Sequence, residues 1–375
     1  MENTNNKKFI KILSFYAIYS WFASFSSSVL PTHFLEQGID YNQMIFGKFL
    51  VFGSPLILLL FLKNFRSKIA WRLAPICYLM FVLLSIRILG STQFYIASVF
   101  AGFSLFFFYV FYNVAHFANT QKEKTGHSSA LMFSVGPVIN IVAPLASGYI
   151  ASVSLTWLWI LAILSFAVCL FFAEKQENFT VSYTIKGALR EIKTTRLFIL
   201  IEGVWGAVPF ALIPIFTLYF IKEPLPYGAY LAYLSLVAVV ANILFGKFTD
   251  KIQKRSIFLY PITIITALFT FLLYFAINDL YLWIIATSLL QFVLPLFWNL
   301  STSLVIDAHT DLKLAIPARE IILSLGRMVG LLLACASLTV EKIPQNIFIL
   351  LGIILLFYPT LLLWNTKVKK KYSYL

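Results

Sequence analysis

The segment GKFTDKIQKR, residues 246–255, is a short basic loop between two long apolar stretches, 229–245 and 256–277. Four of its ten residues are Lys or Arg, and Asp250 is its one acid. Gly246 permits a sharp exit from a helix. Apolar stretches of this length joined by a basic loop are typical of two transmembrane helices that are connected in the cytoplasm.

The composition of the whole chain supports a membrane location. Of its 375 residues 60% are hydrophobic and 12% charged, whereas soluble domains are about a quarter charged. The net charge of +14 falls mainly in short loops, so the orientation of membrane helices explains it better than nucleic-acid binding does. The sequence therefore predicts an integral membrane protein that binds no nucleic acid.

A spanning helix needs about 20 mostly apolar residues, and twelve segments of the chain qualify. Their approximate limits are 9–30, 43–62, 71–89, 93–117, 128–150, 155–173, 197–220, 229–246, 256–277, 281–305, 316–340 and 344–364. We therefore expect an all-α polytopic protein with twelve transmembrane helices.

The distribution of basic residues predicts the orientation. With the N-terminus in the cytoplasm, all but five of the 29 Lys and Arg residues fall in cytoplasmic segments or in the span ends beside them. The five exceptions are Lys48, Arg87, Lys222, Arg327 and Lys342. Both termini are therefore expected in the cytoplasm, in a plasma or inner membrane. Lys48 and Arg87 are expected to extend to the outer surface.

The longest predicted loop divides the chain into three parts. We expect a six-helix bundle over 1–173, a cytoplasmic linker over 174–196, and a second six-helix bundle with a basic tail over 197–375. In the linker, apolar and basic residues alternate at helical spacing over 184–196. This pattern favours a short amphipathic helix on the inner membrane surface, and a basic linker without fixed structure is the alternative.

The loop at 246–255 resembles the loop signature of the major facilitator superfamily, roughly G-x-L-x-D-R-x-G-R-R, which follows the second helix and often the eighth. The matching residues are Gly246, Phe248, Asp250, Lys251, Lys254 and Arg255. Gln253 replaces the second glycine, and the loop 63–72 after the second span is basic but has no acid. The stretches LPTHFLEQGI from Leu30 and AREIILSLGRMVG from Ala318 are similar to first and eleventh helices of the family.

This resemblance implies two six-helix halves that expose one central site alternately to the two sides of the membrane. Helices 1, 4, 7 and 10 would line the cavity, and helices 2, 5, 8 and 11 would flank it. The loop would act as an inner gate through Gly246, Asp250, Lys254 and Arg255. Asp250 would face the start of helix five at 126–129.

One carboxylate lies well inside a predicted span, at Glu202 in FILIEGVWGAVPF, residues 198–210. Charged groups inside a membrane are costly and usually functional. A buried carboxylate beside a cation can gain and lose a proton, so Glu202 is a candidate for proton coupling. The alternative is a static ion pair with Arg327, about eleven residues into the eleventh span. Arg327 could instead hold an anionic group of the substrate.

Further cavity candidates are polar or aromatic residues on the expected lining helices. They are Tyr16, Tyr19, Trp21, Tyr109, Tyr112, Asn113, Gln291, Trp298 and Asn299. Aromatic walls with a few amides suit a sugar-like, aromatic or amphipathic ligand.

Together these features predict a secondary transporter that moves a small solute, with protons as a second partner, and no cofactor or enzymatic activity. We expect a monomer. A lipid or lysolipid flippase on the same fold and a proton-independent uniporter stay as alternatives. An embedded metal-dependent enzyme, with ligands in DAHTD at 307–311, is the weakest reading.

Overall fold

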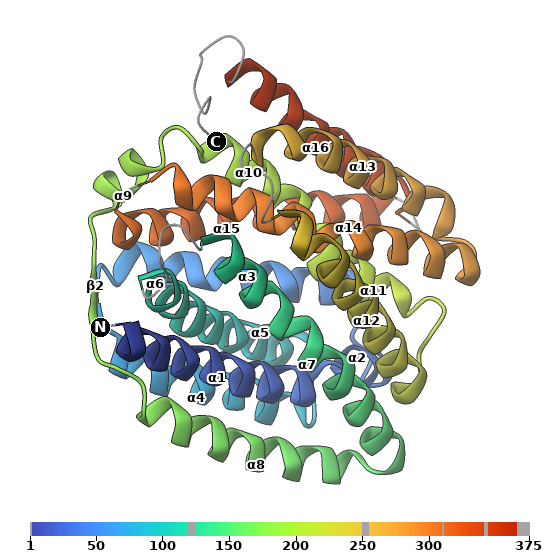
Figure 1. Ribbon diagram of the computed structural model, residues 1–375. Coiled ribbons are helices and arrows are strands. Elements are labelled where there is room, and N and C mark those ends of the chain that lie inside the picture. Colours follow the sequence, from blue (N-terminus) through green and yellow to red (C-terminus); the bar gives the residue numbers. More distant parts are fainter. Residues whose placement is uncertain (1, 119–124, 250–254, 310, 341–343, 366–375) are drawn as a thin grey trace.

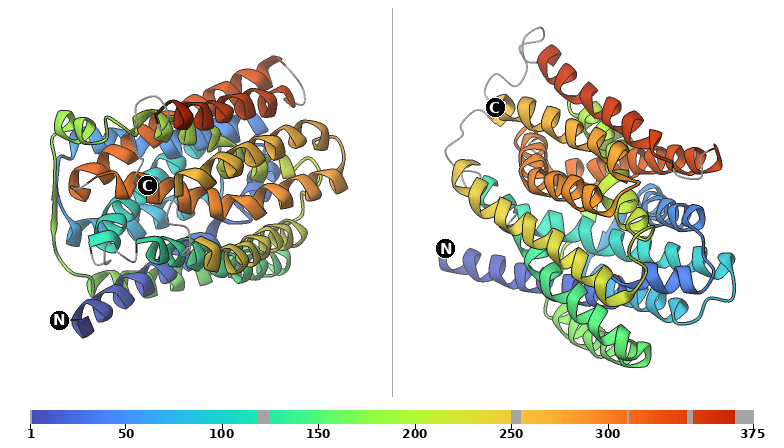
Figure 2. Two further views of the ribbon diagram at one scale, coloured as in Figure 1. Left: turned by 45° about the horizontal axis from the view of Figure 1, so that its top comes forward. Right: turned by 90° about the vertical axis from the view of Figure 1, so that its right-hand side faces the viewer.

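The computed structural model describes residues 2–118, 125–249, 255–309, 311–340 and 344–365. The chain is almost entirely helical, in two groups that lie side by side (Figures 1 and 2). The first group consists of α1 (Glu2–Ser27), α2 (Leu30–Glu36), α3 (Tyr41–Phe61), α4 (Ser67–Ser85), α5 (Ser91–Leu105), α6 (Phe111–Ala118), α7 (Thr125–Val153) and α8 (Leu155–Glu174). The second consists of α10 (Arg196–Trp205), α11 (Ile213–Thr217), α12 (Pro224–Thr249), α13 (Arg255–Ala276), α14 (Leu280–Asp307), α15 (Leu312–Val340) and α16 (Asn346–Leu363).

Among the described residues, eleven helical spans are long and apolar enough to cross a membrane. The multi-pass membrane protein predicted from composition is thus confirmed. The helix of the first predicted span, α1, is not among the eleven, because Lys11 and several Tyr and Ser residues interrupt its apolar positions. The number twelve, like the cytoplasmic placement of the termini, stays a prediction.

Two spans are interrupted by a π-helical turn. One, η1 (Phe106–Val110), joins α5 to α6, and the other, η3 (Val208–Leu212), joins α10 to α11. In η3, Pro209 has no backbone N–H and cannot continue the regular α-helical hydrogen-bond ladder. Such turns are frequent at functional sites, and both contribute residues to the central cavity described below.

Small residues allow α10 and α15 to pack with their backbones in close contact. A Cβ atom on Gly203 would lie 2.8 Å from the carbonyl oxygen of Leu323, and one on Gly326 would lie 2.6 Å from that of Leu200. Gly330 approaches the backbone of Val204 in the same way. The three glycines therefore bring the two helices into close packing, which fixes the register of α15 against α10.

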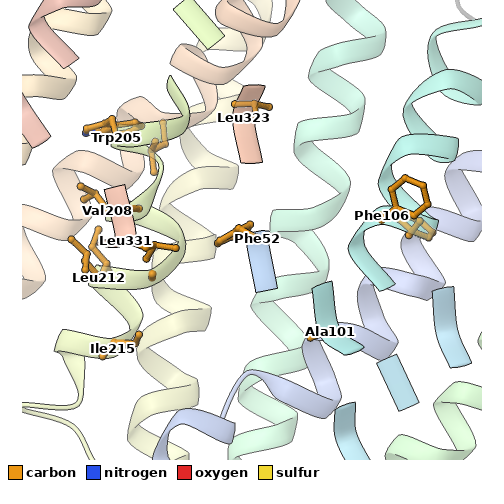
Figure 3. Packing of buried hydrophobic residues seen from close by; sticks show 14 of the residues in the cluster. Phe52, Ala101, Phe106, Trp205, Val208, Leu212, Ile215, Leu323 and Leu331 are labelled. Carbon is orange, nitrogen blue, oxygen red and sulfur yellow. The ribbon is translucent and has the colours of Figure 1, made fainter. Parts of the chain in front are cut away.

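The two groups meet along two seams. One joins α7 to α12, where Gly148 and Gly228 let the backbones approach, and the other joins α3 to α15. Figure 3 shows Phe52 of α3 between apolar residues of the two groups, with Val208 and Leu212 on one side and Ala101 and Phe106 on the other. The interior between the groups is therefore lined by side chains from both.

The linker between α8 and α10 has more structure than its sequence indicates. Residues Thr180–Ser182 form β2, which pairs antiparallel with β1 (Asn64–Arg66) in the loop after α3. The predicted short helix is present as α9 (Ile185–Glu191), and it packs on α15. We call the end of the bundle that carries these elements the linker end, at the left of Figure 1, and the opposite end the far end.

Side-chain contacts hold the linker to the first group. Ser67 donates a hydrogen bond to the carbonyl of Glu177 (3.0 Å) and accepts one from the amide of Phe179 (2.8 Å). Arg72 forms a two-pronged ion pair with Glu174, at 2.5 and 2.9 Å. The backbone of the linker is thus anchored directly beside the start of α4.

The centre of the predicted inner gate loop, residues 250–254, lies outside the described residues. The backbone of Gly246 belongs to α12 and that of Arg255 to α13, while Asp250 and Lys254 lie outside the described residues. The expected contact between Asp250 and the start of α7 therefore stays a prediction.

Candidate functional site

A central cavity of about 630 Å³ lies between the two groups of helices. Of the sequence-predicted residues, it is lined by Glu202, Arg327, Tyr16, Tyr109, Asn113, Gln291, Trp298. The expected helices α1, η1 and α6, α10 and α14 all contribute, and so do α3, α7 and α15, which were expected only to flank the cavity. Its volume falls within the range of about 300–1,000 Å³ that is typical of sites for small molecules.

Four predicted residues do not line this cavity: Tyr19, Trp21, Tyr112 and Asn299. The hydroxyl of Tyr19 lies 2.7 Å from Ser104 inside the first group, and its ring stacks on Phe108. Tyr112 is fully buried and its hydroxyl lies 3.1 Å from Nδ1 of His116. Neighbouring positions on a helix differ by about 100°, so these side chains point into helix contacts while Tyr16 and Tyr109 reach the cavity.

At the wall formed by α10, Glu202 is 5% exposed and has two polar partners from different helices. The hydroxyl of Ser301 on α14 donates a hydrogen bond to Oε2 at 2.5 Å. The guanidinium of Arg319 on α15 donates to Oε1 at 3.2 Å. Arg319 also pairs with Glu320 at 3.2 Å and contacts the Thr302 hydroxyl at 3.3 Å. One arginine thus joins two carboxylates.

The pairing of Glu202 with Arg327 is therefore corrected: the ion-pair partner is Arg319. Arg327 follows Arg319 by eight residues on α15, which is about 12 Å along the axis and about 80° around it. Because Gly326 lies against Gly203 of α10, the next residue points away from α10 and toward α3. Sequence reasoning overlooked Arg319 because it was assigned to the end of the span.

Arg327 lies instead against two aromatic rings. Its guanidinium carbon is 4.8 Å from the ring centre of Phe52 on α3 and 5.0 Å from that of Phe210 in η3. Phe210 in turn stacks on Trp298, with ring centres 5.2 Å apart. Within the described part of the chain, Arg327 forms no ion pair, and its buried Nε has no hydrogen-bond partner. The side chain contacts both groups of helices and keeps its polar donors free.

Lys48 is the third basic residue of the cavity. It lines the cavity wall on α3, so the expectation that it extends to the outer surface is wrong. Position 48 is one helical turn before Phe52 and therefore lies on the same face of α3. Within the described parts of the chain, the charged residues of the lining are thus Lys48, Glu202, Arg319, Glu320 and Arg327.

The helix arrangement and the central cavity define a polytopic membrane protein built of two helix groups around one internal site. No family model and no curated sequence matches the chain. Solved structures do match along almost the whole length.

One similar structure is the human organic anion transporter MFSD10 (TETRAN), at 11% identity and a TM-score of 0.67, covering 94% of this chain and 99% of that one. A second is a bacterial homologue of the iron transporter ferroportin in an outward-facing state, at 12% identity and 0.68, covering 95% and 98%. A third is the E. coli fucose:proton symporter FucP (N162A), at 12% and 0.63, covering 94% and 98%. The chain therefore shares the fold of these three solved transporters, in agreement with the fold that the loop resemblance implied.

Proposed function

We propose that this protein is a secondary transporter that moves a small solute by alternating access and couples that movement to protons at Glu202. The observation that carries the proposal is the Glu202–Arg319–Glu320 cluster on the wall of a cavity between two helix groups. Three similar folds belong to transporters, one of which is the E. coli fucose:proton symporter.

The chemistry of the cluster suits the uptake of one proton. With all three groups ionised, two carboxylates share one guanidinium, so the cluster carries one uncompensated negative charge. Protonation of Glu202 removes that charge and weakens its attraction to Arg319, which keeps Glu320 as its partner. A proton can therefore change the contact between α10 and α15 without leaving a buried arginine unpaired.

A change at the Glu202–Arg319 pair can also affect the other helix group. On α15, Arg319 is two turns from Arg327, whose side chain rests on Phe52 of α3 across the seam. A shift of α15 relative to α10 would move this contact. We take this as the route by which protonation biases one conformation over the other.

The proposal is tested by transport in proteoliposomes. A thermal-shift screen of the purified protein against metabolites, drugs and lipids, at mildly acidic and mildly basic pH, first supplies a transported ligand. Glu202→Gln, which mimics the protonated state, should then retain exchange of labelled for unlabelled ligand and lose accumulation driven by a pH gradient. Accumulation at the wild-type level in Glu202→Gln would contradict proton coupling at this residue and leave a uniporter as the better account.

A further inference from the structure

The charges of the cavity do not balance. Among the residues that the structure describes, its lining holds three basic residues, Lys48, Arg319 and Arg327, against two acidic ones, Glu202 and Glu320. Both carboxylates are taken by Arg319. In the described chain, Lys48 and Arg327 have no carboxylate within ion-pair distance. Over the described residues, the lining therefore carries a net formal charge of +1, which comes from Lys48 and Arg327.

The surroundings of Arg327 show where a ligand's negative charge would bind. A guanidinium offers five donors in a planar fork that matches a carboxylate or sulfonate. The rings of Phe52 and Phe210 stabilise its positive charge but accept no strong hydrogen bond. Arg327 thus presents a buried Nε without a hydrogen-bond partner to the cavity, as far as the described residues show.

Beside these donors is an apolar aromatic wall. Phe210 stacks on Trp298, and Phe52 lies 6.0 Å from Phe210 between ring centres. Tyr109 also lines the cavity. A ligand whose charged group binds Arg327 would place its body against these rings.

We infer that the cavity binds an organic anion, a carboxylate or sulfonate carried on an aromatic or alkyl body. The anionic group binds Arg327, Lys48 adds a second positive charge one helical turn toward the far end, and the body packs on Phe52, Phe210 and Trp298. The ligand class is argued from the cavity alone. Only the coupling of anion binding to protons rests on the proposed function.

The coupling follows from the charge count. A proton on Glu202 raises the cavity charge from +1 to +2 and so favours the anion, and by linkage the bound anion favours the proton. The charged and titratable groups around Glu202 are Arg319, Glu320 and Arg327 on α15 and Tyr358 on α16, while α14 adds only the hydroxyls of Ser301 and Thr302. Proton and anion would therefore be transported in the same direction.

Binding to the full-length protein in a non-ionic detergent tests the ligand class without any transport. The probes are 3-phenylpropane-1-sulfonate, which stays ionised at every pH used, its neutral sulfonamide, and 3-phenylpropylammonium. Only the sulfonate should bind. Arg327→Met should weaken its binding roughly ten- to hundredfold, the usual loss for a charged hydrogen bond. Arg327→Lys, which keeps the charge and loses the fork, should fall between the two.

The matched control is Arg87→Met, because Arg87 is exposed and outside the cavity lining. It should bind the sulfonate as the wild type does. Equal binding of the sulfonamide or the ammonium compound, no binding of the sulfonate, or equal affinities in Arg327→Met and Arg87→Met would each overturn the assignment.

The pH dependence tests the coupling separately. Sulfonate affinity should rise as the pH falls in the wild type, and this rise should be lost in Glu202→Gln. The same rise in both proteins would overturn the coupling and leave the ligand class standing. If the sulfonate binds in an Arg327-dependent way but protons do not drive its uptake into liposomes, only the proposed function is refuted. If protons drive the uptake of a neutral solute and Arg327→Met leaves that uptake unchanged, only the anion site is refuted.

Discussion

At the scale of single residues, Glu202 and Arg319 stabilise each other inside the protein. The exposed fractions of their side chains are 6% and 13%. A charge left without a partner at such a depth is costly, because the protein interior replaces little of its hydration. Ser301 and Thr302 add hydroxyl groups that satisfy part of the remaining hydrogen-bonding capacity.

Arg319→Met should therefore destabilise the protein strongly, since it leaves Glu202 buried without a cation. Removing one partner of a buried ion pair lowers the free energy of unfolding by up to about 3–5 kcal/mol. Arg327→Met, which breaks no ion pair, is the matched control and should cost much less. Melting temperatures in detergent measure both, and the double variant Glu202→Gln with Arg319→Met should recover part of the loss. Similar losses in Arg319→Met and Arg327→Met would argue against the pair.

Sequence reasoning identified the buried acid but not its partner, and helix depth explains why. Glu202 lies six residues after the start of α10 and Arg319 seven after the start of α15, so they are about 9 and 10 Å from the linker end. Arg327 is fifteen residues in, about 22 Å. The eleventh span was expected to begin at 316, which left Arg319 at its edge. A helix that starts at Leu312 places Arg319 at nearly the same depth as Glu202.

At the scale of helices, the contact between α10 and α15 depends on three glycines. Gly203, Gly326 and Gly330 let the two backbones meet, and this contact places Arg319 beside Glu202. A larger residue would have to separate the helices that carry the pair.

Gly326→Ala tests this contact, because its Cβ would lie 2.6 Å from the Leu200 carbonyl oxygen. Overpacking of this kind typically costs about 1–3 kcal/mol. Gly90→Ala makes the same chemical change at an extended position with no atom within 4 Å of the new Cβ. A clear drop in melting temperature is expected for Gly326→Ala alone. Equal melting of the two variants would mean that the helices are not held this closely.

The linker helix α9 is tied to the second group by a histidine. Nε2 of His309 lies 2.8 Å from the Thr195 hydroxyl, and Nδ1 lies 4.0 Å from a carboxylate oxygen of Glu191. Burial lowers the pKa of His309 from its usual 6.5, although the Glu191 carboxylate opposes this shift. The surroundings of His309 therefore favour the neutral imidazole.

Because the folded pKa is the lower one, the unfolded chain binds more protons, and the contribution of His309 to stability is lost as the pH falls below about 6.5. His309→Gln cannot take up a proton and can still reach Thr195. The melting temperature of the wild type should therefore fall more steeply than that of His309→Gln between neutral and mildly acidic pH. Parallel curves would show that His309 does not titrate in this range.

The linker also shows which elements sequence patterns could predict. Its helix was expected from the spacing of apolar and basic residues and was found over Ile185–Glu191. The pairing of β1 with β2 was not expected, because three-residue strands carry no periodic signal and their partners are far apart in the chain. The hydrogen bonds of Ser67 to the linker lie beside this pairing, and the sequence did not predict them either.

At the scale of the whole molecule, the two helix groups contact each other at the far end. Gly148 of α7 lies against Pro224 and Gly228 of α12, and the ring of Tyr41 on α3 packs on Tyr219, which follows α11, with centres 4.5 Å apart. Alternating access requires these contacts to open when the opposite end closes.

Gly148→Leu should disfavour the far-end contact, because a side chain there meets the backbone of Pro224. In a background with Cys77, Cys169 and Cys335 replaced, Lys48→Cys reports the accessibility of the cavity to a water-soluble maleimide. Its labelling in proteoliposomes should rise several-fold in Gly148→Leu, while Gly90→Leu, a control with open space around the residue, should leave it unchanged. Unchanged labelling in both would contradict a closing role for this seam.

The overall architecture was the most predictable property. Hydropathy and a ten-residue loop were sufficient to predict the facilitator fold, since spans of about 20 apolar residues leave few alternatives in a bilayer. The cavity was less predictable, because its lining depends on helix rotation and on two π-helical turns that change it in mid-span. Lys48 illustrates this: hydropathy placed it at the surface, and the rotation of α3 turns it inward.

Proton coupling at Glu202 requires that its carboxyl group gains and loses a proton within the pair with Arg319. Infrared absorption of the purified protein, recorded as the pH is lowered, tests it without a ligand, because a carboxyl group gives a high-frequency C=O band when it is protonated and not when it is ionised. Comparison of the wild type with Glu202→Gln isolates the contribution of this residue, and Glu320→Gln serves as the control. The predicted result is a component of this band that is present in the wild type and in Glu320→Gln and missing from Glu202→Gln. Identical spectra of the wild type and Glu202→Gln throughout the range in which both stay folded would identify Glu202 as a permanently ionised structural partner and contradict the proposed coupling.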